Sequence, residues 1–160
     1  MTIQHVIEVQ QEVSLPETVD LKFLRVAALA TLKQQQIEEK VELTLVLTDD
    51  DSLQALNRRF RGVDRPTDVL SFANETRGPF AGGATGRPQY LGDIVISLPT
   101  AMQQSEEAGC TLTEELQLLI VHGTLHLLGY DHESPMDKTE MWAVQARLLE
   151  LLDIEAPLPE

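Results

Sequence analysis

The 160-residue sequence lacks the features of secreted, membrane-spanning and general polyanion-binding proteins. Its single cysteine, Cys110, excludes a disulfide within the chain and fits a reducing, cytoplasmic compartment. The N-terminus has neither the basic start nor the apolar run of a signal peptide. The longest apolar runs, such as 118–121, are too short to cross a bilayer. We therefore expect a cytoplasmic protein with one globular domain over residues 1–160 and no membrane partner.

Basic residues are scarce, with 12 Lys plus Arg against 26 Asp plus Glu and a net charge of −14, which argues against a general polyanion binder. They are also unevenly distributed. Residues 58–87 hold six arginines and three acids, a local charge of six minus three, or +3. A phosphate-bearing substrate would have to dock there. The arginines are Arg58, Arg59, Arg61, Arg65, Arg77 and Arg87.

Solvated charge on a helix end and a loop explains most of this cluster equally well. Arg61 stands apart, because it lies at the end of a predicted helix, just before Gly62 and the loop that contains Pro66. We therefore expect a functional role for Arg61. The candidate substrate-binding residues are Arg58, Arg59 and Arg65.

Periodicity and turn residues predict an α+β fold, a small mixed β-sheet of about four strands packed with about five helices. The predicted strands are 3–9, 41–47, 68–72 and 90–97. The predicted helices are 19–36, a helix capped by residues 48–51 that ends at Gly62, 98–108, 112–128 and 135–152. Residues 74–89, rich in glycine and proline, predict a surface loop that is a lid, a binding element or disordered.

Helical spacing predicts the buried faces of the first two helices. For the first helix these residues are Leu21, Leu24, Val26, Ala28, Leu29 and Leu32, and for the second they are Leu53, Leu56 and Phe60. Thr111 followed by Glu114 predicts a capping box at the start of helix 112–128.

Three of the four histidines fall within residues 122–132. His122 and His126 are four apart, so on a helix they share one face. Gly129 can leave the helix through a left-handed conformation, which brings His132 back from a third direction. Three neutral imidazoles fit one Zn²⁺ ion with a fourth position left for water, which is the arrangement of a catalytic rather than a closed structural site.

The same spacing occurs in the metzincin proteases, whose H-E-x-x-H-x-x-G-x-x-H motif matches residues 122–132 at every position but one. Gly123 stands where those proteases have the glutamate that acts as general base. The sequence thus predicts a metzincin-like three-histidine metal site without the protease machinery. The alternatives are three histidines that cluster without a shared role, and a closed structural zinc site with Asp131 or Cys110 as fourth ligand.

Two aspartates near these motifs have two equally weighted interpretations. Asp93 is either a residue at the edge of the core that backbone amides satisfy, or a carboxylate behind the metal site that accepts a hydrogen bond from the N–H group of a ligand histidine. Asp131, next to His132, has the same two interpretations.

Three motifs in this order resemble the YbeY family. They are Phe-Arg-Gly at 60–62 followed by Asp-Arg-Pro-Thr-Asp-Val-Leu-Ser-Phe at 64–72, then Leu-Gly-Asp-Ile at 91–94, then the block 122–132. The resemblance covers about residues 40–150. It implies a metal-dependent, single-strand-specific endoribonuclease that acts in maturation of the small-subunit rRNA 3′ end and in ribosome quality control. It also implies zinc ligands at His122, His126 and His132 and a functional arginine at Arg61.

The residues suggest a mechanism that fits this resemblance. A metal ion held there would activate water or polarise a phosphoryl oxygen, and Arg61 would neutralise charge on the phosphate in the transition state. Attack by the RNA 2′-hydroxyl would leave a cyclic phosphate, whereas attack by water need not, and the motif fits both. Two other functions fit part of the pattern: a metallohydrolase of peptides or small molecules, and a non-catalytic ribosome-associated zinc protein.

Overall fold

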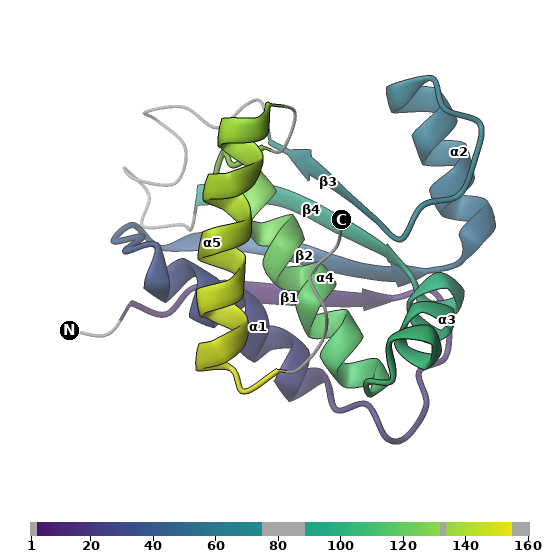
Figure 1. Ribbon diagram of the computed structural model, residues 1–160, viewed down its shortest axis with the longest axis horizontal. Coiled ribbons are helices and arrows are strands. Elements are labelled where there is room, and N and C mark those ends of the chain that lie inside the picture. Colours follow the sequence, from purple (N-terminus) through teal and green to yellow (C-terminus); the bar gives the residue numbers. More distant parts are fainter. Residues whose placement is uncertain (1–2, 75–88, 132–133, 155–160) are drawn as a thin grey trace.

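The computed structural model describes residues 3–74, 89–131 and 134–154, arranged as helices packed on a β-sheet (Figure 1). The strands are β1 (Val6–Gln11), β2 (Val41–Thr48), β3 (Val69–Ala73) and β4 (Gln89–Ser97). The helices are α1 (Leu21–Gln34), α2 (Asp50–Arg61), α3 (Leu98–Ala108), α4 (Leu112–Leu127) and α5 (Pro135–Leu151). Most of the predicted loop 74–89 lies outside the described residues.

The sheet has the strand order β1-β2-β4-β3. β1, β2 and β4 run parallel, and β3 pairs antiparallel with β4 at the edge. The predicted α+β class is thus confirmed, with a mixed sheet of four strands and five helices over the described parts of the chain. None of the helices described here is long and apolar enough to cross a membrane.

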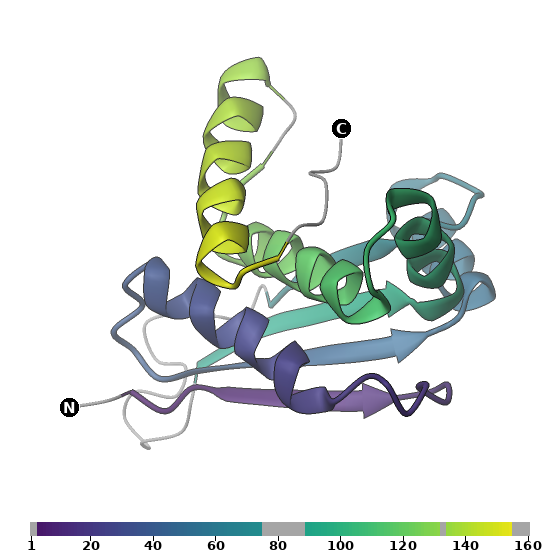
Figure 2. The ribbon, with the colours of Figure 1, turned by 60° about the horizontal axis from the view of Figure 1, so that its bottom comes forward.

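Helix α4 lies at the centre of the core. It packs with α1 on one face of the sheet, while α5 contacts both helices on their far side (Figure 2). Alternate residues of the strands point toward α4, including Leu43, Leu45, Ile94 and Ile96, all fully buried. The alternation read from the sequence therefore identifies the buried face of the sheet.

Capping residues mark the start of α4 and both ends of α2. Thr111 and Glu114 form the predicted capping box at the start of α4. Asp49 caps α2 by accepting a hydrogen bond from the Ser52 amide at 2.9 Å. Gly62 ends α2, as predicted, and it adopts a left-handed conformation.

Two predicted core faces are partly wrong. Val26 and Leu29 of α1 are 37% and 36% exposed, because the buried stripe runs through Leu24, Ala28 and Leu32 and leaves them on the helix flank. Phe60 of α2 is 57% exposed. The reason is that α2 covers only one corner of the second sheet face. Its small apolar cluster centres on Leu53, Leu70 and Val95.

Candidate metal centre

Two histidines of α4 face each other at its C-terminal end. The Nε2 atoms of His122 and His126 lie 3.1 Å apart, and their rings meet at 80° with centroids 4.6 Å apart. The four-residue spacing on one helix produces this juxtaposition, as the sequence predicts. Trp142 of α5 packs edge-on against His122 with a centroid distance of 5.7 Å.

The other nitrogen of each ring is held by an oxygen. His122 Nδ1 lies 3.0 Å from Gln145 Oε1, and His126 Nδ1 lies 2.9 Å from the Tyr130 carbonyl oxygen. These oxygens only accept hydrogen bonds, so each Nδ1 carries the proton and donates it. Each Nε2 then presents its lone pair toward the other ring.

Two lone pairs directed at one point fit a cation between them. Zinc binds imidazole nitrogen at about 2.0–2.1 Å, which places two tetrahedral nitrogen ligands about 3.3 Å apart. The observed 3.1 Å is close to that value. The hydrogen bonds at Nδ1 are also those that orient ligand histidines in metal proteins. The donor set therefore fits a divalent metal ion.

The turn after α4 positions the rest of the motif. Gly129 has φ +105°, the positive value predicted for it, and its amide donates to the His126 carbonyl at 3.0 Å. The predicted third ligand, His132, lies outside the described residues, so the three-histidine site stays a prediction. Among the residues with described positions, no group of three or more His, Cys, Asp or Glu side chains is placed to hold a metal.

A closed zinc site that uses Cys110 does not fit this geometry. Cys110 precedes α4, whereas the histidines lie at its other end, about 18 Å away for twelve residues of helix. Burial and the neighbouring carboxylates of Glu115 and Glu114 raise the pKa of the Cys110 thiol, which disfavours the thiolate that zinc binds.

Arg61 of α2 lines the same groove as the two histidines of α4. A groove of about 590 Å³ is lined by Arg61, His122, His126 and Asp131, among others. The loop after α2 is tied back by the buried Asn57, whose side-chain amide donates to the Arg65 carbonyl at 2.9 Å. Arg61 and His122, 61 positions apart in the sequence, thus line the same groove.

The other predicted arginines are not in this groove. Arg58 and Arg59 lie exposed on the last turns of α2, and Arg65 is exposed in the loop that follows. Arg77 and Arg87 lie outside the described residues.

Asp93 lies on the other face of the sheet. Ile94 points toward α4, so its neighbour Asp93 points away, where its carboxylate accepts a hydrogen bond from the Tyr90 hydroxyl. Neither His122 nor His126 lies on that face, so Asp93 is not their hydrogen-bond partner, and a hydrogen bond from His132 to Asp93 stays a prediction.

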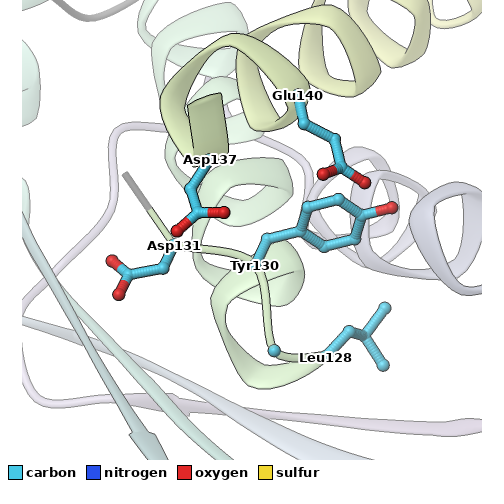
Figure 3. A pocket seen from close by; sticks show the side chains of 6 residues that line it. Leu128, Tyr130, Asp131, Asp137 and Glu140 are labelled. Carbon is cyan, nitrogen blue, oxygen red and sulfur yellow. The ribbon is translucent and has the colours of Figure 1, made fainter. Parts of the chain in front are cut away.

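Asp131 does lie beside the histidines. It lines the groove and also a smaller hollow of about 270 Å³ between the turn after α4 and the start of α5. Figure 3 shows Asp137 and Glu140 reaching from α5 toward Tyr130 and Asp131. A hydrogen bond from a ligand histidine to the Asp131 carboxylate fits this location and stays a prediction.

Sequence reasoning missed Gln145, which is fully buried and holds His122. A signal for it exists. Gln145 follows Met141 by four residues and precedes Leu148 by three, so a polar side chain interrupts the apolar stripe of α5.

The packing at Gly123 shows why this chain has no glutamate at the position of the metzincin general base. A Cβ atom at this position would lie 2.7 Å from Ile94 Cγ2 and 3.1 Å from Ser71 Oγ, so α4 meets the sheet with no space for a side chain. The Ser71 hydroxyl also donates to the Gly123 carbonyl at 3.2 Å. A general base of the metzincin kind cannot occupy this position, which argues against a peptidase.

This α+β domain has a histidine pair whose donor set fits a divalent metal ion, and an arginine lines the same groove. The family model described as Endoribonuclease YbeY matches residues 5–153, and the chain belongs to this family.

Similar proteins that carry the same family name cover most of the chain. An Endoribonuclease YbeY of Roseiflexus sp. (strain RS-1) is 44% identical over 85% of this chain and 86% of its own length. The Endoribonuclease YbeY of Chloroflexus aurantiacus (strain J-10-fl) is 42% identical over 94% of this chain and 97% of its own. The solution structure of TM1509 from Thermotoga maritima is 28% identical with a TM-score of 0.59, over 92% of this chain and 89% of that one.

Proposed function

We propose that this protein is a zinc-dependent endoribonuclease that cleaves single-stranded RNA at the groove between α2 and α4. Its membership of the Endoribonuclease YbeY family supports the reaction. The observation that carries the site is the pair of imidazoles with Nε2 atoms 3.1 Å apart, each fixed through Nδ1 by an oxygen. Arg61 lines the same groove.

His122, His126 and, by the spacing of the motif, His132 would hold the ion. A divalent ion so held supplies an activated water or polarises a phosphoryl oxygen. The chain itself contributes orientation. Gln145 fixes His122, the turn at Gly129 and Tyr130 fixes His126, and neither ring can rotate without losing a hydrogen bond.

Arg61 would bind the scissile phosphate. A guanidinium offers two parallel N–H donors to two phosphate oxygens, and it stabilises negative charge that grows in the transition state. Arg61 lines the same groove as the two imidazoles, which supports a phosphate bound between this cation and the metal ligands. Arg58, Arg59 and Arg65 would contact the flanking backbone phosphates.

The proposed substrate in the cell is the 3′ end of small-subunit rRNA on the ribosome, in the cytoplasm, with a role in ribosome quality control. Family resemblance supports this setting. Arg61 is the one arginine among the described residues that line the groove of this acidic protein, so RNA binding should depend only modestly on salt.

The test is cleavage of single-stranded and double-stranded RNA of equal sequence by zinc-loaded protein. We expect cleavage of the single strand, and cyclic phosphate ends if the 2′-hydroxyl attacks. Arg61→Ala should keep its zinc and lose cleavage by about 100-fold or more. Arg147→Ala, an exposed arginine of α5, is the matched control and should cleave normally. Full cleavage by folded, metal-free protein would refute the proposal.

A further inference from the structure

A second hollow lies on the far side of β3 from the groove. Its volume is about 760 Å³, within the range of about 300–1,000 Å³ of small-molecule sites. Ser71 and Ala73 line both the hollow and the groove. Because β3 is an edge strand, a chain that leaves the groove needs to pass only this one strand to enter the hollow.

Aromatic side chains line one wall of the hollow. The Phe60 ring is 57% exposed and meets the Phe72 ring at 62°, with centroids 5.1 Å apart. The guanidinium carbon of Arg59 lies 5.1 Å from the centroid of the Phe60 ring. An exposed phenylalanine in contact with an arginine and a second ring resembles the platforms on which proteins stack single-stranded bases.

The charges around the hollow favour a base over a phosphate inside it. Asp93 lines the hollow, and its carboxylate would repel a phosphate but can accept a hydrogen bond from a base N–H group. Positive charge lies at the aromatic wall, on Arg59. A nucleotide can therefore place its base inside and its phosphate outside.

We propose that this hollow, formed around Phe60, Phe72 and Asp93, binds a nucleobase of the RNA next to the phosphate held by Arg61. Phe60 and Arg61 are consecutive residues at the end of α2, so one helix end positions both the base and the phosphate. This proposal rests on the proposed function, and it makes Phe60 a residue for substrate binding rather than for the chemical step.

The experiment measures KM and kcat for a single-stranded RNA with wild type, Phe60→Ala and Phe60→Tyr. Stacking on an aromatic ring corresponds to roughly 5- to 100-fold in affinity. We expect Phe60→Ala to raise KM by such a factor with kcat and zinc content unchanged, and Phe60→Tyr to behave like wild type. Phe23→Ala removes a phenylalanine of α1 that is 51% exposed, and should leave KM unchanged.

A scan of single abasic sites along the RNA completes the test. One abasic position next to the cleaved bond should raise KM for wild type but not further for Phe60→Ala. An unchanged KM in Phe60→Ala, with wild type active, would overturn the base site alone. If Phe60→Ala no longer bound purified small ribosomal subunits but kept a normal KM for RNA, this face would be a protein-docking surface. That result would also overturn the proposed base site. Inactive wild type would mean that the proposed function itself has failed.

Discussion

Helices α4 and α2 both end at the groove, but they are held in the fold very differently. Eleven of the sixteen residues of α4 are buried. Only two of the twelve residues of α2 are buried, and it covers a corner of the sheet. Metal ligands must stay within a few tenths of an ångström of their positions, whereas a cation for phosphate must be exposed. The buried helix carries the histidines and the peripheral one carries the arginine.

The largest effect is expected at His126. His126→Ala removes one of the two facing imidazoles, so zinc binding should be abolished. His5→Ala is the control, because His5 is the one histidine outside the motif and accepts a hydrogen bond from the Val41 amide far from the groove. Zinc content after dialysis measures both. If His126→Ala still retained one equivalent of zinc, the histidine pair would not be the metal site.

A smaller loss is expected at Gln145, whose oxygen holds the His122 ring. Gln145→Leu should lower the affinity for zinc about 10–100-fold, the usual effect of removing a hydrogen-bond partner of a ligand histidine. Gln145→Glu keeps an oxygen at that position and should retain affinity. Competition with a zinc chelator gives the affinities. Equal affinities for both variants would show that packing alone orients His122.

Gly123 tests how tightly α4 sits on the sheet. Gly123→Ala inserts a methyl group 2.7 Å from Ile94 Cγ2, and should lower the free energy of unfolding by about 1–3 kcal/mol. Gly62→Ala at the end of α2 has nothing within 4 Å and is strained only by its φ of +71°, so it should cost about 1 kcal/mol. Denaturant unfolding of both variants compares the two helices directly. A neutral Gly123→Ala would contradict the close packing.

The smallest effect concerns Glu115, which is only 5% exposed on α4. Burial, and then the charge of Asp68, raise the pKa of the Glu115 carboxyl from 4.5 to about 7. Between pH 4.5 and about 7, the native state keeps a proton on the Glu115 carboxyl that the unfolded chain releases. The contribution of protonated Glu115 to stability is therefore complete below pH 4.5 and is lost as the pH rises to about 7.

Glu115→Gln should remove this loss and be more stable than wild type at pH 8 by about 1–2 kcal/mol, after allowance for solvent screening. At pH 4.5 the two should match. Glu106→Gln, an exposed acid of α3, is the control and should follow wild type at both pH values. Thermal unfolding of the three proteins at pH 4.5 and pH 8 measures these differences. Equal stability of Glu115→Gln and wild type at pH 8 would contradict the raised pKa of Glu115.

Local signals in the sequence were enough for much of this architecture. Thr111 with Glu114, Gly62 and Gly129 act through their own backbone, so their roles follow from short spacings. The facing pair His122 and His126 follows from helical geometry in the same way.

Other features depend on the assembled fold and could not be predicted locally. Gln145 meets His122 only because α5 crosses α4. Phe60 has the spacing of a core residue, but its helix lies at a corner of the sheet. The side of the sheet on which Asp93 lies depends on the register of β4 with β2 and β3.

X-ray absorption at the zinc edge of the loaded protein tests the central claim most directly, because it reports which atoms surround the ion. The arrangement of His122 and His126 predicts one bound zinc with imidazole nitrogen at about 2.0–2.1 Å. It predicts no sulfur ligand, since Cys110 is at the far end of α4. Zinc without imidazole neighbours, or with a sulfur atom at about 2.3 Å, would contradict it.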